Sequence, residues 1–197
     1  MSQIITNIND LDFNGSYTYA DYLLWQFSER LEIIKGKIFK MSPAPSRCHQ
    51  QVLLKLTREI DKFFMNLNCE LYIAPFDVRL INYKKSTANN QIFTVVQPDL
   101  CIICDLSKLD DRGCIGSPNL IIEILSNGNP NTDLKIKFDL YEENAVQEYW
   151  IVNPSEKTIL IYSLQNDKYI GSRPFTTDTE IQSVTFPDLK FEVNKIF

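Results

Sequence analysis

An acidic residue stands in the middle of an apolar segment, residues 119–126 (NLIIEILS), that has the composition of a β-strand. Upstream, Asp99 follows a proline and leads into a second apolar segment, residues 100–104. Segments apolar on both faces are typical of central strands buried from both sides. An unpaired carboxylate there costs several kcal/mol, so we expect Glu123 to be paired, protonated or bound to a metal. Two acids entering on neighbouring strands indicate a cation held by oxygen ligands, and hence metal-assisted hydrolysis.

The length and composition are those of an ordinary globular protein. With 197 residues, the chain is most simply one domain spanning 1–197, and it is long enough for a substantial core. No segment approaches the roughly 20 apolar residues that cross a bilayer. The first residues also lack the basic and apolar parts of a secretory signal. We therefore expect a cytoplasmic protein with no membrane partner.

Charge and cysteine content narrow the functional classes only slightly. The net charge of -5 argues against a strongly basic protein that coats nucleic acids. The net charge does not exclude an enzyme that binds DNA or RNA through a local patch. The five cysteines are an odd number in irregular spacing, which suits a reducing compartment. Cys101 and Cys104 stand three apart in a predicted strand and point to opposite faces, so we expect core side chains there and no shared metal.

The pattern of apolar residues predicts an α/β (α+β) domain with a mixed central sheet flanked by helices, an N-terminal β-hairpin and extra C-terminal strands. The hairpin turns at Gly36, and residues 105–117 form a charged loop. Helices are predicted at 18–29, 46–67 and 133–144. Strands are predicted at 31–35, 37–41, 70–74, 77–82, 93–104, 119–126, 148–152, 158–163, 168–171 and 181–186.

The helix predicted at 133–144 places a lysine among apolar side chains. At about 100° per residue, Asp133 and Lys137 fall inside the apolar arc, one turn apart, whereas Lys135 lies on the solvated side. A lysine in that arc either extends to its edge or is held beside buried carboxylates. Asp99, Glu123 and Lys137 together suit the hydrolysis of a phosphodiester. The carboxylates would hold one or two Mg²⁺, and the lysine would orient water or stabilise developing charge.

Several of these segments resemble the Uma-two family, a branch of the PD-(D/E)xK nuclease superfamily. The matching parts lie along almost the whole chain: residues 32–37, 42–45 with 49–50, 98–99, 122–126, 133–141, 148–154, 186–189 and 196–197. The resemblance implies a restriction-endonuclease-like fold, Mg²⁺ (or Mn²⁺) as cofactor and DNA as substrate. It also implies a metal site made of Asp99, Glu123 and the backbone carbonyl of Ile124.

One position departs from the superfamily pattern. The superfamily's lysine would stand two residues after the acid, where this chain has Leu125. The resemblance implies a migrated lysine, and the helical arc selects Lys137 over Lys135. The missing lysine favours a catalytically inactive, nuclease-like module that binds a partner or forms a homodimer. The retained acids and Lys137 favour an active endonuclease. The same chemistry also serves RNA, and the sequence does not separate these alternatives.

Four further residues are auxiliary candidates, namely Asp133 of the predicted helix, Asp77, Glu32 and His49. Asp77 is either another metal-site acid or the partner of Arg79 or another strand-edge group. Glu32 is an auxiliary acid or, in the reading we favour, a surface residue of the hairpin. His49 is expected in the first helical turn as a neutral, hydrogen-bonded imidazole, since the helix dipole disfavours its charged form. The alternative for His49 is to position phosphate or water.

The remaining predictions concern nucleic-acid contacts and packing. Arg47, Lys84 and Lys85 would contact phosphates at the rim of the site, unless they are simply solvated. Tyr141 and Trp150 are expected to be packing residues of the core.

Overall fold

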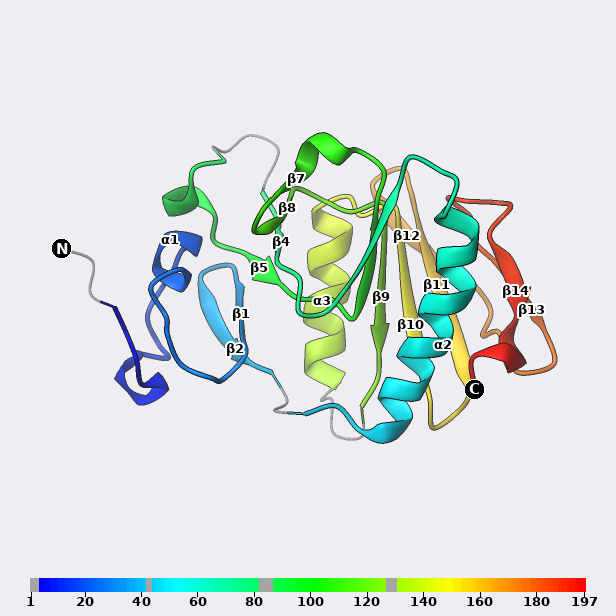
Figure 1. Ribbon diagram of the computed structural model, residues 1–197, viewed down its shortest axis with the longest axis horizontal. Coiled ribbons are helices and arrows are strands. Elements are labelled where there is room, and N and C mark those ends of the chain that lie inside the picture. The colour runs from blue at the N-terminus through cyan, green and yellow to red at the C-terminus, as the bar shows by residue number, and fades with distance from the viewer. Residues whose placement is uncertain (1–3, 42–43, 82–86, 127–130) are drawn as a thin grey trace. The chain divides into compact units, whose positions relative to one another are not determined.

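The computed structural model describes residues 4–41, 44–81, 87–126 and 131–197, with only the backbone for 131–133 (Figure 1). The chain divides into two compact units. One comprises residues 1–44, 76–97 and 109–117, and the other comprises 45–75, 98–108 and 118–197. Each unit has its own six-stranded mixed sheet, so the predicted mixed α+β architecture is confirmed. The single domain over 1–197 stays a prediction.

The first unit is built around the sheet β2-β1-β5-β4-β8-β7, in which only β4 and β8 run parallel. The predicted hairpin is present, and its turn residues Lys35 and Gly36 both have positive φ, as a tight two-residue turn requires. The elements of this unit are η1 (Ile8–Asp10), α1 (Tyr19–Tyr22), β1 (Leu31–Ile34), β2 (Lys37–Lys40), β4 (Val78–Arg79), η2 (Asn89–Gln91), β5 (Val95–Val96), β7 (Leu109–Asp110) and β8 (Gly113–Ile115).

Helix α1 is much shorter than the predicted 18–29. It begins as the sequence indicates, because the side chains of Thr18 and Asp21 form a capping box. After Tyr22 the chain leaves the helix: the Leu24 carbonyl accepts from the Ile5 amide, and Trp25 forms a β-bridge with Ile5. A pairing with a segment far away in sequence therefore replaces the last two predicted turns.

The second unit contains the sheet β12-β11-β10-β9-β6-β3, in which β9 and β10 run parallel and all other pairs are antiparallel. Its helices are α2 (Arg47–Phe64), η3 (Leu106–Lys108), α3 (Asn131–Glu143) and η4 (Val193–Lys195). Its strands are β3 (Glu70–Ile73), β6 (Leu100–Ile103), β9 (Leu120–Ile124), β10 (Glu148–Asn153), β11 (Thr158–Gln165), β12 (Lys168–Gly171), β13 (Glu180–Gln182) and β14 (Lys190–Glu192).

Helices α2 and α3 flank this second sheet, as predicted (Figure 1). The apolar side of α2 packs in one cluster with the even-numbered residues of β6 and β9 and with Trp150 of β10. The odd-numbered residues of β9 and β10 face α3, where Tyr141 contacts both Glu123 and Tyr149. Because strand side chains alternate between faces, each face of the sheet meets one helix.

Three further segments differ from their predicted structures. The predicted strand 93–104 is divided into β5 and β6, because Pro98 has no amide hydrogen to continue a ladder, and the two parts join different sheets. The predicted loop 105–117 contains the strand pair β7 and β8. Strand β14 near the C-terminal end was likewise not predicted, and it pairs with β13.

Cys101 and Cys104 were predicted as core side chains. Cys101 is buried and outside any disulfide, and Cys104 packs against the core but forms a disulfide with Cys69, which the sequence did not predict. Glu70 pairs with Ile103 across β3 and β6, so one further step of this register brings the two bonded cysteines opposite each other. The part of the chain that the structure describes contains no helix with the length and apolar composition to span a membrane.

The disulfide predicts a defined thiol count. In denaturant without reductant, the protein should show the three free cysteines, and reduction should raise the count to all five. In the folded protein only Cys48, which is exposed, should react rapidly. Replacing Cys69 and Cys104 by serine should lower the free energy of unfolding by about 2–4 kcal/mol, whereas Cys48→Ser should have little effect. Five reactive thiols without reductant would contradict the disulfide.

Candidate functional site

The register of β6 and β9 places the two predicted acids opposite each other. Leu100 pairs with Ile122 and Cys101 with Ile121, so one further step of the same register sets Asp99 across from Glu123. Their carboxylates are nevertheless held from different helices, Asp99 by His49 of α2 and Glu123 by two residues of α3, so the predicted common face of the two carboxylates stays a prediction. They lie where β6 begins and β9 ends, in the second unit.

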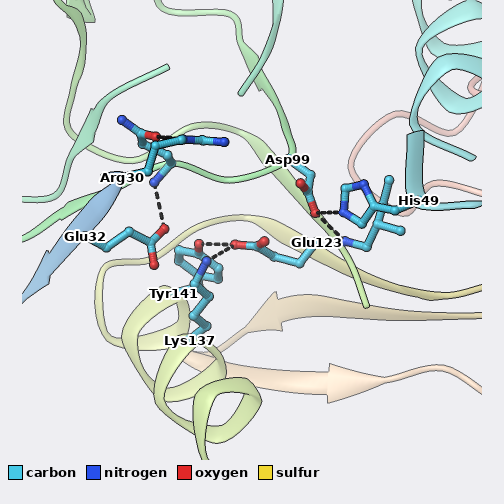
Figure 2. A network of polar contacts seen from close by, with 9 residues as sticks. Arg30, Glu32, His49, Asp99, Glu123, Lys137 and Tyr141 are labelled. Carbon is cyan, nitrogen blue, oxygen red and sulfur yellow. Dashed lines mark hydrogen bonds and ion pairs between the residues drawn. The ribbon is translucent and has the colours of Figure 1, made fainter. Parts of the chain in front are cut away.

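The carboxylate of Glu123 is held by two side chains of α3. Lys137 Nζ and Tyr141 Oη both donate to Glu123 Oε1, at 2.8 and 2.7 Å respectively (Figure 2). The donors stand one turn apart on α3, so both reach the same carboxylate. Lys135 is exposed, and the structure therefore brings the predicted lysine, not its neighbour, to the acid.

Tyr141 was expected only to fill the core. It is indeed fully buried, and its ring packs edge-to-face against Tyr149. Its hydroxyl nevertheless contacts the central acid of the site. The spacing of four residues from Lys137 could have indicated this contact, because side chains at i and i+4 share one helix face.

The carboxylate of Asp99 is held from the other helix and from the backbone. Its Oδ2 accepts from the Ile124 amide at 2.8 Å and lies 3.1 Å from His49 Nε2 (Figure 2). His49 is buried in the first turn of α2, which begins at the N-cap Ser46. Since Asp99 takes both of these contacts on Oδ2, its Oδ1 is the oxygen left for a further ligand.

The His49 imidazole favours its charged form more than the sequence suggested. The hydrogen bond to Asp99 raises the pKa of His49 above its ordinary value of 6.5, against the opposing effect of burial. The negative charges of Asp99 and Glu123 act in the same direction as the hydrogen bond. The carboxylates therefore outweigh the helix dipole, which we had expected to keep this histidine neutral.

Glu32 corrects a prediction for the first unit. Glu32 was expected at the surface of the hairpin, but its side chain is buried. Its Oε1 accepts a hydrogen bond from the backbone N–H of Gln97 at 2.8 Å. The reason is that β1 is an interior strand, paired with β2 on one side and β5 on the other.

The carboxylate of Asp77, also in the first unit, is held by Gln97 and two tyrosines. It accepts from Gln97 Nε2 at 2.9 Å and from the hydroxyls of Tyr19 and Tyr22 at 3.3 and 3.5 Å. Burial, together with the charge of Asp77, raises the pKa of Tyr19 to about 12 and that of Tyr22 further. Arg79 instead forms an ion pair with Asp110.

The predicted nucleic-acid contacts and the last auxiliary acid are only partly described. Arg47 is exposed at the first position of α2. Lys84 and Lys85 lie outside the described residues, as does the side chain of Asp133. Within the described part of the chain, no three His, Cys, Asp or Glu residues come close enough to hold a metal ion by themselves.

The mixed sheet with a helix on each face is the architecture expected of a restriction-endonuclease-like protein. The family model of Uma2, described as "Putative restriction endonuclease", matches residues 19–194. The chain belongs to the Uma2 family.

The chain is also similar to two individual proteins. The chain is 25% identical over 150 residues to an uncharacterized protein of Synechocystis sp., slr1290, covering 75% of this chain and 74% of that protein. It is also similar to the crystal structure of a protein from Anabaena variabilis described as a putative nuclease belonging to DUF820, with a TM-score of 0.68 and 17% identity. That alignment covers 92% of this chain and 97% of the other, and it shows a common fold.

The contact between His49 and Asp99 predicts a measurable titration. His49 is the only histidine, so NMR should show one imidazole signal, with a pKa above 6.5 in the wild type. Asp99→Asn should lower this pKa, and Glu123→Gln should lower it less, because Glu123 acts through charge alone.

The raised pKa of His49 also determines how the stability of the fold changes with pH. Because folding raises the pKa of His49, protonated His49 adds to the free energy of unfolding. This contribution is fully present below about pH 6.5 and is lost as the pH rises through the folded-state pKa. Equal His49 pKa values in the wild type and in Asp99→Asn would contradict the contact.

Proposed function

We propose that this protein is a metal-dependent endonuclease that hydrolyses DNA phosphodiester bonds with Mg²⁺ or Mn²⁺. The observations that carry the proposal are the hydrogen bond that the amide of Ile124, next to Glu123, donates to Asp99, and the ion pair between Lys137 and Glu123. Membership of the Uma2 family supports the reaction class. The assignment of a metal, of DNA and of each residue's role is our inference.

The donor atoms of the site suit a hard divalent cation. Asp99 and Glu123 offer carboxylate oxygens, and the backbone carbonyl of Ile124 belongs to the same strand end. Mg²⁺ is commonly bound by one or two carboxylates and completes its shell with water and substrate phosphate, so two acids are sufficient. Such an ion would neutralise the phosphate and lower the pKa of a bound water.

The role proposed for Lys137 follows from its place beside Glu123. Its side chain is only 17% exposed, and its ammonium is held at the acid by a 2.8 Å ion pair. From there it would orient the attacking water or stabilise the charge that develops on the phosphate oxygens. In the reaction, the water oxygen bonds to phosphorus, the bond from phosphorus to the leaving sugar oxygen breaks, and that oxygen gains a proton.

Asp99, the second acid of the proposed site, would act together with His49. The Ile124 amide and His49 fix the Asp99 carboxylate through Oδ2, so that its second oxygen keeps a defined direction. The exposed Arg47, two residues before His49, would contact a phosphate of the DNA backbone.

A second candidate function is a nuclease-like binding module without activity. The Lys137–Glu123 ion pair favours it, because this contact already satisfies the buried acid without a metal. Leu125 at the usual position of the lysine points the same way. Cleavage assays with matched DNA and RNA substrates distinguish a DNase, an RNase and an inactive protein. Measurement of the molecular size of the free protein then shows whether an inactive module is a dimer.

The two acids provide the first test of the nuclease. Asp99→Asn and Glu123→Gln should each lower Mg²⁺-dependent cleavage by more than about 100-fold, because each removes a charged metal ligand. Both variants should still unfold cooperatively, since the amides keep the size of the side chains. Asp61→Asn, at an exposed position of α2, is the matched control and should cleave like the wild type. Loss of activity only through unfolding of both variants would count against the site.

The two lysines of α3 provide the second test. Lys137→Ala should reduce kcat by about 100-fold or more, because an ammonium near the reacting phosphate is lost. Lys135→Ala should leave kcat unchanged, since Lys135 is exposed on the same helix. Parallel cleavage kinetics at saturating Mg²⁺ measure both values. Equal activities of the two variants would remove Lys137 from the mechanism and favour the binding module.

A further inference from the structure

Two side chains of α3 donate to the same oxygen of Glu123, but they differ in mobility. Lys137 has a long, flexible stem and is partly exposed. Tyr141 is fully buried, and its ring is fixed against Tyr149 with the ring centroids 5.0 Å apart. The phenol is therefore the fixed donor to Glu123, and the ammonium is the movable one.

The two donors also differ in charge. An ammonium beside a carboxylate repels a divalent cation that approaches the same group, whereas a neutral hydroxyl adds no such repulsion. A hydrogen bond from a neutral donor to a carboxylate is nevertheless strong and directional. Tyr141 can thus hold Glu123 in place while the carboxylate binds a cation, and Lys137 is less suited to do so.

We propose that Tyr141 is a positioning residue, whose hydroxyl fixes the Glu123 carboxylate and allows Lys137 to turn toward water or phosphate. The catalytic consequence rests on the proposed nuclease function. The positioning itself is a property of the metal-free protein, because the 2.7 Å contact exists without any ligand.

Tyr149 offers a matched control within the same aromatic pair. It is as fully buried as Tyr141, yet its hydroxyl has no hydrogen-bond partner in the described structure. Tyr→Phe at either position removes one hydroxyl and keeps the ring. Tyr149→Phe should therefore be at least as stable as the wild type, because it removes an unsatisfied buried group.

Crystal structures of the metal-free variants test the positioning directly. In Tyr141→Phe we expect the Glu123 carboxylate to move by on the order of 1 Å or to lose order, because a fixed donor is gone. It should stay in place in Tyr149→Phe. It should also stay in place in Lys137→Met, a second variant that leaves Tyr141 as the donor. An unchanged Glu123 in Tyr141→Phe, or a displaced one in Lys137→Met, overturns the proposal.

Mn²⁺ titration of the same variants tests the consequence for the site. Tyr141→Phe should weaken Mn²⁺ binding by about 10- to 100-fold, as loss of a group that orients a metal ligand typically does, and Tyr149→Phe should not. If the wild type cleaves but all three proteins bind Mn²⁺ equally, Tyr141 has no role in the site. If the wild type neither binds Mn²⁺ nor cleaves, the proposed function fails, and the crystal structures still decide whether Tyr141 positions Glu123.

Discussion

The buried carboxylate of Glu123 is the constraint on which the second unit depends most. Glu123 lies on a strand with neighbours on both sides, between the buried side chains of Ile122 and Ile124. A charge in such a place needs donors, and the strand's own backbone is already used by its ladders. Helix α3 supplies these donors from one face, so Lys137 and Tyr141 fix its rotation and its position along the sheet.

The local patterns of the sequence predicted this part of the molecule well. The acid in an apolar strand and the lysine in an apolar helical arc can each be recognised within a single segment. In the structure these two residues, Glu123 and Lys137, contact each other. The hydroxyl of Tyr141 was missed because an aromatic residue in the same arc is explained by packing alone. The Cys69–Cys104 disulfide was missed because it depends on which strands are neighbours, which no single segment encodes. The early end of α1 at Tyr22 has the same cause, a β-bridge to Ile5.

The two acids are held in different ways, and this difference gives the site its chemistry. Asp99 is fixed by a backbone amide and by an imidazole whose pKa it raises, whereas Glu123 is fixed by an ammonium and a phenol. Each carboxylate therefore has a cationic or titrating partner, which relieves their mutual repulsion without a metal. A divalent cation would take over this neutralising role and leave Lys137 and His49 able to interact with water and phosphate.

Stability alone does not explain why Glu123 and Lys137 occupy these positions. The Coulomb attraction within a buried ion pair is largely cancelled by the desolvation of both charges, so an apolar pair of similar size is often as stable or more stable. The surrounding residues of β9 show that this sheet readily accommodates apolar side chains at this depth. The ion pair satisfies Glu123 in either candidate function, but its small contribution to folding and the second acid near the same strand end favour the nuclease that we propose. We therefore favour the nuclease, in which both the Asp99 carboxylate held through Oδ2 and the Lys137 ammonium beside Glu123 would have a role.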